Sequence, residues 1–159
     1  MTLTGSCMCG GVTYAVEADT YTAALCHCTD CQKWSGGAFT SNAVVPRTSM
    51  KITKGNIRQC TSHYDQLLYL TPTFYTGTPN SYDAIGNSGK INKHFFCPTC
   101  GSNLYTELEI MPDMTCIKAG TLDGGEANLK GKIDVEFYIK DRPAYLAPVE
   151  GAKQEQLLG

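Results

Sequence analysis

Hydrophobic and polar residues alternate over short stretches of the chain, and Gly, Pro, Asn or Asp separates one stretch from the next. A period of two places successive side chains on opposite faces of an extended strand. Residues 12–16 show this alternation clearly, and residues 133–139 form the longest predicted strand. Shorter strands are predicted at 42–45, 50–53, 57–60, 94–96, 104–106 and 115–118. The pattern therefore predicts a mainly β protein, with a hairpin turn at residues 54–56.

Three segments depart from the strand pattern. Residues 29–35, directly after Cys28, are expected to form a helical turn. The segment Thr61–Lys93 is rich in Thr, Tyr, Ser, Asn, Gly and Pro and shows little periodicity, so we expect an irregular insertion there. A segment of this length inside a compact domain often serves as a functional loop or lid, although a plain surface loop is the more common case. The polar tail from Gly151 is expected to fray.

Length and charge narrow the class of protein. We expect a single domain over residues 1–159, with the insertion at about 61–93, because 159 residues suffice for one hydrophobic core. The net charge of −2, without a run of Lys and Arg, argues against a nucleic-acid partner. The apolar runs are too short to span a bilayer, and the N-terminus lacks the features of a secretory signal. We therefore expect a cytoplasmic protein with no nucleic-acid or membrane partner; no sequence feature indicates an oligomeric state.

Nine cysteines are the most informative feature of the composition. In a reducing compartment disulfides are disfavoured, and clustered cysteines more often bind metal or carry out redox chemistry. Seven of the nine fall into three tight clusters. Cys60 and Cys116 stand alone in predicted strands, where a free cysteine usually acts as a small buried hydrophobic residue.

The segment Cys97–Gly101 has the spacing of a zinc knuckle. Two intervening residues let both sulfurs face one ion, and Gly101 permits the positive φ that such a turn tends to require. A knuckle supplies only half of a tetrahedral site. Cys7 and Cys9, followed by two glycines, are its natural partner, whereas the alternative is that both are merely buried at a strand end. The glycines and the half-filled site favour metal binding.

Cys26, Cys28 and Cys31 form a second constellation, in which three sulfurs can reach one ion and no fourth cysteine lies near in sequence. His27 is a possible fourth ligand. An extended backbone between Cys26 and Cys28 would instead turn His27 away from the metal, which favours a supporting, substrate-facing or simply packed histidine. A redox pair of Cys28 and Cys31 ranks lower, because the βαβ context of thioredoxin-like motifs is missing.

The charge of a three-thiolate site indicates its chemistry. A zinc ion with three thiolates carries a net charge of −1, so it is a weaker Lewis acid than zinc held by three histidines. Such an ion is better suited to holding a substrate thiolate beside an electrophile than to activating water. The donor set therefore favours thiol chemistry over hydrolysis.

Three motifs in this order resemble those of the glutathione-dependent formaldehyde-activating family, which includes the centromere protein V-like proteins. They are Cys-x-Cys-Gly, Cys-His-Cys-x-x-Cys and Phe-Cys-x-x-Cys-Gly-Ser, and they stand here at residues 6–12, 26–33 and 96–102. The resemblance runs from Gly5 to about Gln154. It departs from the family at the long insertion and at Tyr145, where tryptophan is frequent.

The resemblance implies a β-tent fold of stacked antiparallel sheets and two zinc ions per chain. It assigns a structural zinc to Cys7, Cys9, Cys97 and Cys100, and a catalytic zinc to Cys26, Cys28 and Cys31. It also implies a carbon–sulfur lyase that joins glutathione to formaldehyde, so the expected partners are a small-molecule thiol and an aldehyde. Two alternatives stay open: a zinc enzyme of the same scaffold acting on a larger metabolite without glutathione, and a non-catalytic zinc binding module.

Overall fold

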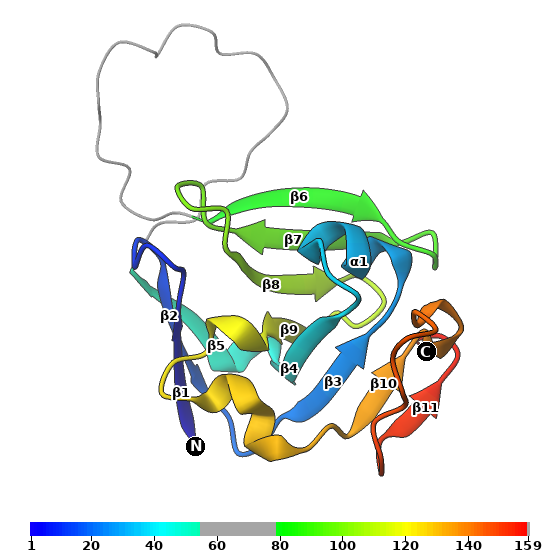
Figure 1. The fold of residues 1–159 in the computed structure, drawn as a ribbon. Coiled ribbons are helices and arrows are strands. Elements are labelled where there is room, and N and C mark those ends of the chain that lie inside the picture. Colours follow the sequence, from blue (N-terminus) through cyan, green and yellow to red (C-terminus); the bar gives the residue numbers. More distant parts are fainter. Residues whose placement is uncertain (55–78, 159) are drawn as a thin grey trace, which may run out of the picture.

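The computed structural model of the protein describes residues 1–54 and 79–158. The described chain folds into two β-sheets, with short helical segments between some of the strands (Figure 1). This confirms the predicted mainly β class. The predicted strand at 57–60 and the lone Cys60 lie outside the described residues.

The smaller sheet is antiparallel and has three strands, β1 (Thr2–Ser6), β2 (Thr13–Glu17) and β5 (Met50–Lys54). The central strand β2 pairs with both neighbours. Tyr14 and Val16 are buried on one face of β2, while Thr13, Ala15 and Glu17 are more exposed. The alternation predicted for residues 12–16 is therefore confirmed, and it turns one face of this sheet toward the core.

Eight strands form the larger sheet, in the spatial order β11-β10-β3-β4-β9-β8-β7-β6. Their bounds are β3 (Thr22–Cys26), β4 (Thr40–Pro46), β6 (Asn80–Ile85), β7 (Ile91–Phe96), β8 (Asn103–Leu108), β9 (Met114–Lys118), β10 (Val135–Phe137) and β11 (Lys153–Glu155). From β3 to β6 in this order the neighbours are antiparallel, whereas β10 runs parallel to both β3 and β11. The sheet is therefore mixed at one edge and antiparallel elsewhere.

The two faces of the larger sheet differ in role. One face joins the smaller sheet in the main hydrophobic core through Ala23, Ala43, Val45, Phe95, Tyr105 and Ile117. Neighbouring residues of a strand point to opposite faces, so Asn42 and Lys118 point away from this core. The second face is the floor of the candidate site.

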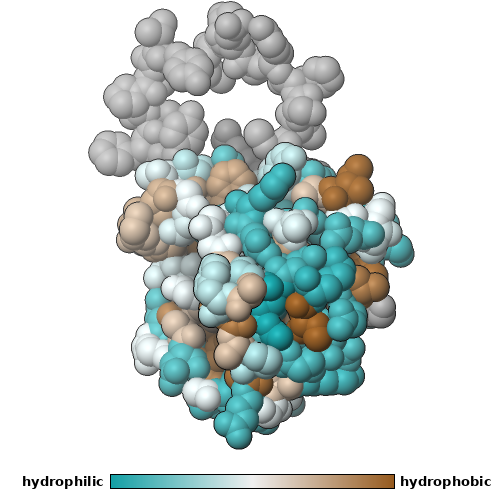
Figure 2. Space-filling view, turned by 45° about the vertical axis from the view of Figure 1, so that its right-hand side comes forward, coloured by the Kyte–Doolittle hydropathy of each residue, from teal (hydrophilic) through white to brown (hydrophobic). Residues whose placement is uncertain are grey.

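The helical elements of the described chain are short. They are α1 (Thr29–Ser35) and the 3-10 helices η1 (Arg47–Ser49), η2 (Ala119–Thr121), η3 (Glu126–Gly131) and η4 (Ile139–Asp141). The helix α1 confirms the helical turn predicted after Cys28. No helix within residues 1–54 and 79–158 has the length and apolar character needed to cross a membrane. On the face shown in Figure 2, hydrophobic residues are scattered among hydrophilic ones.

Part of the predicted irregular insertion is regular, so the prediction is wrong for residues 80–93. They form β6, a tight turn and the beginning of β7, which pair as a hairpin. The Gly86 N–H donates to the Lys90 carbonyl at 2.9 Å, and Gly89 adopts a φ of 74° in the turn. β6 is an edge strand with no buried residue on either face, so its sequence carries no alternation to detect.

Two predictions near the C-terminus also need correction. Only Val135–Phe137 of the predicted strand 133–139 is extended, because Tyr138 adopts a left-handed φ of 58° and η4 follows. The tail does not fray throughout, since Lys153–Glu155 pair with β10 as β11. Tertiary hydrogen bonds order this polar segment, and they leave no trace in hydrophobic periodicity.

Candidate metal centres and active-site cavity

Cys7, Cys9, Cys97 and Cys100 come together at one place, with their sulfur atoms within 4.8 Å of one another. The Sγ atoms of Cys7 and Cys9 are 3.5 Å apart, and those of Cys9 and Cys97 are 3.7 Å apart. Cys7 follows β1 of the smaller sheet, and Cys97 follows β7 of the larger one. The four-cysteine cluster therefore joins the two sheets.

Tight turns bring these cysteines together. The Cys97 N–H donates to the Ser102 carbonyl at 2.9 Å, and the Gly101 N–H donates back to the Cys97 carbonyl at 2.9 Å. Gly101 has a φ of 71°, and Gly10, directly after Cys9, has a φ of 67°. The left-handed conformation predicted for Gly101 is confirmed, and Gly10 adopts the same conformation in the turn after Cys9.

Nearby donors favour the thiolate form of Cys7 and Cys100 in the four-cysteine cluster, while burial raises the pKa of Cys97. The Val12 N–H donates to the Cys7 sulfur at 3.2 Å, and the Cys100 sulfur lies 3.2 Å from the Ser102 hydroxyl. Burial opposes ionisation of Cys100, yet the hydrogen bonds from Ser102 lower its pKa to about 6. Four closely spaced sulfurs with thiolate-stabilising donors fit a closed tetrahedral zinc site.

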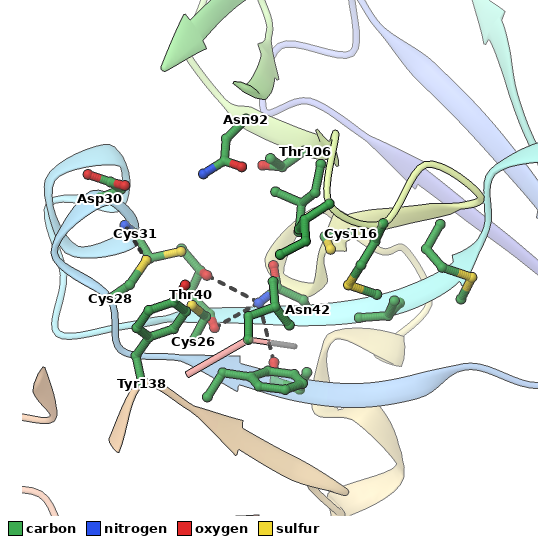
Figure 3. A pocket seen from close by; sticks show the side chains of 18 of the residues that line it. Cys26, Cys28, Asp30, Cys31, Thr40, Asn42, Asn92, Thr106, Cys116 and Tyr138 are labelled. Carbon is green, nitrogen blue, oxygen red and sulfur yellow. Dashed lines mark hydrogen bonds between the residues drawn. The ribbon is translucent and has the colours of Figure 1, made fainter. Parts of the chain in front are cut away.

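Cys26, Cys28 and Cys31 form the three-cysteine cluster, again with sulfurs within 4.8 Å of one another. Cys26 ends β3, Cys28 caps the N-terminus of α1, and Cys31 lies in the first turn of that helix (Figure 3). The Cys31 N–H donates to the Cys28 sulfur at 3.3 Å. Hydrogen bonds from Cys26 and Cys28 lower the pKa of Cys31 to about 2, while those with Cys28 and Cys31 raise the pKa of Cys26. Three sulfurs gathered at one point, one of them with a lowered pKa, suit a soft metal ion.

His27 turns away from this cluster. Its Nε2 atom lies 2.9 Å from Glu136 Oε1, its ring packs edge-on against Phe39, and it is 1% exposed. Within the described part of the chain, no other Cys, His, Asp or Glu groups with the three sulfurs. The side-chain direction inferred from an extended backbone is therefore confirmed, and His27 is a packed residue.

Glu136 is the centre of a buried polar network behind the cluster. Its second oxygen, Oε2, accepts from Gln154 Nε2 at 2.6 Å, from the Val149 N–H at 2.8 Å and from Arg142 Nη1 at 3.3 Å. Burial alone would raise the pKa of Glu136, but these bonds and the contact with His27 lower it. The network attaches the C-terminal segment to the loop that carries Cys26 and Cys28.

A cavity of about 270 Å³ lies beside the three-cysteine cluster (Figure 3). Its polar lining includes the three cysteines together with Asp30, Thr40, Asn42, Asn92, His94, Thr106, Lys118 and Tyr138. Its apolar lining includes Val44, Leu108, Ile110, Met111, Met114 and Phe137. None of the cysteines of the four-cysteine cluster lines it. The three-cysteine cluster therefore faces a cavity, whereas the four-cysteine cluster only connects structural elements.

Most polar residues of the cavity were not predicted from the sequence. Asn42, His94, Thr106 and Lys118 lie in strands, where the alternation separates two faces but does not say which face borders a cavity. Tyr138 is held in the left-handed region, where a non-glycine residue often marks a functional site. The location of these residues at the cavity depends on how the strands pair. In the sequence, the one indication of it is a polar residue among apolar residues of a strand.

Two buried side chains, Lys118 and His94, determine the charge of the cavity wall away from the cysteines. Lys118 Nζ donates to Asn42 Oδ1 at 2.8 Å. His94 Nδ1 lies 3.0 Å from the Thr106 hydroxyl, and its ring stacks on Trp34 with centroids 4.5 Å apart. Burial and the nearby charge of Lys118 lower the pKa of His94 to about 4, so its ring is neutral at pH 7. The cavity therefore combines a cation and a neutral imidazole with the three sulfurs.

The sequence family follows from a direct comparison. The model of the family described as glutathione-dependent formaldehyde-activating enzyme matches residues 2–141. The chain belongs to this family. The match includes all seven clustered cysteines, so the resemblance inferred from the three motifs is confirmed.

A solved structure agrees with the fold. The chain is similar to a Rhodobacter sphaeroides protein whose crystal structure was solved as a structural-genomics target, with 18% sequence identity and a TM-score of 0.52. The similarity covers 82% of this chain and 96% of that one, which shows a shared fold. A comparison with curated proteins gave no match.

Proposed function

We propose that the protein is a zinc-dependent carbon–sulfur lyase-type enzyme that joins a thiol, glutathione, to a small aldehyde such as formaldehyde. The observation that carries this proposal is the position of the three-cysteine cluster in the wall of a cavity. Membership in the family supports glutathione and formaldehyde as the substrates. A non-catalytic zinc module would not need this cavity.

The two cysteine clusters would have different roles, one structural and one catalytic. Cys7, Cys9, Cys97 and Cys100 would hold a structural zinc, because four sulfurs complete a tetrahedron. Cys26, Cys28 and Cys31 would hold a catalytic zinc and leave one position open toward the cavity. When bound there, zinc would keep the sulfur of an incoming thiol in its thiolate form.

The residues around the cluster supply positioning. The His27–Glu136 contact fixes the loop between Cys26 and Cys28, and therefore the direction of both sulfurs. The cavity walls hold the aldehyde beside the cluster, so that two reactants meet in a fixed geometry and much of the entropic cost of their encounter is removed. The apolar walls also limit the access of water.

Exchange NMR of glutathione with formaldehyde tests the proposal, since these reactants also combine without an enzyme. We expect zinc-loaded protein to accelerate their equilibration above the uncatalysed rate. Cys31→Ser should lose this acceleration by at least about a hundredfold, because it removes one of three metal ligands. Zinc-loaded wild-type protein that accelerates no thiol–aldehyde pair would contradict the proposed reaction.

One observation favours the second candidate, a larger substrate. Asn87, Ser88 and Asn92 of the β6–β7 hairpin line the cavity, and they lie within the insertion expected at about 61–93. A hairpin that adds residues to a cavity wall can alter which substrate fits. The apolar part of the lining also favours a larger substrate.

A further inference from the structure

Lys118 is a buried cation in the floor of the cavity. It is 8% exposed and its one side-chain hydrogen bond within the described residues goes to a neutral amide, Asn42. No ion pair joins it to a carboxylate in residues 1–54 or 79–158. Its charge also lowers the pKa of the nearby Cys31 thiol, and an ammonium has three N–H donors, of which Asn42 takes one. A ligand oxygen in the cavity is the group that these donors fit.

Asn42 holds the lysine in place. Its amide nitrogen donates to the Ala24 carbonyl at 3.3 Å and to the Thr40 carbonyl and hydroxyl at 3.0 and 3.1 Å. These bonds fix which end of the amide faces Lys118, so Oδ1 accepts from the ammonium. The position of the charge is thus set by the strands and not by solvent.

The strand register orders the cavity floor into three zones. Cys26 pairs with Thr40 at one end, Lys118 lies one row further along, and Cys116 and Met114 follow on β9. Successive rows on one face of a sheet are about 7 Å apart. In Figure 3 the labelled Cys26 and Thr40 accordingly lie on one side and Cys116 on the other. A ligand along this floor meets sulfur first, then the ammonium, then apolar side chains.

The far zone is suited to a hydrocarbon. Met111, Met114 and Cys116 pack beside Ala24 and Val44 in a second hydrophobic cluster. Leu108 and Ile110 also line this part of the pocket. Methionine side chains are flexible and adapt to apolar ligands of different shape. Formaldehyde has no carbon chain that would occupy this zone.

We propose that the cavity takes an aldehyde with an apolar chain, whose carbonyl oxygen accepts a hydrogen bond from Lys118 and whose chain lies over Met111 and Met114. The proposal rests on the proposed thiol–aldehyde reaction. The thiolate sulfur donates an electron pair to the carbonyl carbon and a carbon–sulfur bond forms. The π bond of the carbonyl breaks, and its electron pair moves onto the oxygen beside Lys118. That oxygen takes a proton from Lys118, which regains one from water, and the product is a neutral hemithioacetal.

A binding experiment tests the ligand site without any reaction. Hexanoate mimics the oxyanion and an apolar chain, and acetate is the matched ligand without the chain. Each buried CH₂ strengthens binding about fourfold, or about 0.8 kcal/mol. We expect zinc-loaded wild-type protein to bind hexanoate at least about tenfold more tightly than acetate by calorimetry. Fluorescence of Trp34, the chain's one tryptophan, should respond because it stacks on His94 of the cavity wall.

Matched variants make this test specific. Lys118→Gln keeps a donor for Asn42 but removes the charge, so hexanoate binding should weaken about tenfold or more, and Lys118→Arg should restore part of it. Lys51→Gln, on the exposed side of β5, is the control and should bind like the wild type. Zinc content and melting temperature show whether each variant is folded. Wild-type protein that does not bind hexanoate, or folded Lys118→Gln that binds it equally well, overturns the proposal.

Kinetics separate this proposal from the reaction on which it rests. Removing one oxyanion donor typically costs about 10²–10³ in rate, so Lys118→Gln should lose about that factor with hexanal while the KM for glutathione stays unchanged. Met114→Ser should reduce the preference for hexanal over formaldehyde. If the wild type accelerates no pair but binds hexanoate through Lys118, the ligand site stands and the proposed reaction is wrong. If it accelerates formaldehyde and hexanal alike, and Lys118→Gln does the same, the reaction stands and this inference is wrong.

Discussion

Cys97 and Cys28 carry the same sulfur in different settings. Cys97 is 1% exposed and belongs to the main hydrophobic core, where its cluster joins the two sheets. Cys28 caps the helix α1 beside the cavity, and it is not part of that core. A metal bound only by the native state contributes its binding free energy to folding. The four-cysteine cluster should therefore carry more of the stability.

The matched pair Cys97→Ser and Cys28→Ser measures this difference. We expect Cys97→Ser to lower the melting temperature by about 6–20 °C, since a loss of about 3–5 kcal/mol shifts Tm by about 2–4 °C per kcal/mol in a chain of this size. Cys28→Ser should stay folded but inactive. Circular dichroism melts of both zinc-loaded proteins decide, and equal destabilisation would show that the two roles are misassigned.

Glu136 gives a pH-dependent prediction. Its pKa is lowered in the folded protein by the donors around it, so its contribution is present above its unfolded pKa, about 4.3, and is lost as pH falls toward the lower folded pKa. Urea unfolding of wild type and Glu136→Gln should give a stability difference that shrinks as pH falls below about 4.3. A difference that is constant from pH 6 to pH 3 would contradict the role assigned to this carboxylate.

At the residue scale the sequence predicted the ligand groups but not the cavity. Cysteine spacing is local, so the three clusters and the left-handed Gly101 could be found from neighbouring residues. Lys118 lies 87 residues from Cys31 in sequence and His94 lies 63 residues from it, and only strand pairing brings them to one cavity. Long-range pairing is the information that a single sequence lacks.

At the scale of elements, most strands that pack on the core were predicted, although the interior strand β3 was missed, and the edge strands β6 and β11 were not predicted. β2, β4 and β9 alternate or run buried because a core lies against them. β6 and β11 stand at the two edges of the larger sheet and have no buried residue. Their order comes from backbone pairing and polar contacts, which hydrophobic periodicity does not record.

Gln154 tests whether polar contacts hold β11 in place. Its side chain donates to Glu136 Oε2 at 2.6 Å and accepts from Arg142 Nη1 at 2.8 Å. Gln154→Ala should destabilise the protein by about 1–3 kcal/mol, because it leaves a buried charged group short of a partner. Hydrogen exchange should speed up at Lys153–Glu155, while the exposed control Gln156→Ala should leave both quantities unchanged. Unaltered exchange in Gln154→Ala would mean that backbone pairing alone orders the strand.

At the scale of the whole molecule, the hydrophobic core and the candidate site lie on opposite faces of the larger sheet. The smaller sheet covers one face of the larger, and the four-cysteine cluster joins them. The opposite face of the larger sheet carries the cavity and the three-cysteine cluster. Changes on the cavity face should therefore alter ligand binding with less effect on the core.

The two separate cysteine clusters predict the metal content of the protein. We expect two zinc ions per wild-type chain purified without chelator, and one in Cys31→Ser. Cys116→Ser removes a cavity thiol that lies outside both clusters and should retain two. Elemental analysis against protein concentration measures this, and a single zinc in fully loaded wild-type protein would rule out the two-site interpretation.

The most direct test of the central claim asks whether a thiol joins the metal at the three-cysteine cluster. Cobalt(II) in place of zinc reports its ligands, because each thiolate–cobalt bond contributes charge-transfer absorption. Adding glutathione should increase this absorption in the wild type, and Cys31→Ser should show no increase. A cobalt-loaded wild-type protein whose spectrum is unchanged by saturating glutathione would contradict a thiol-binding metal centre.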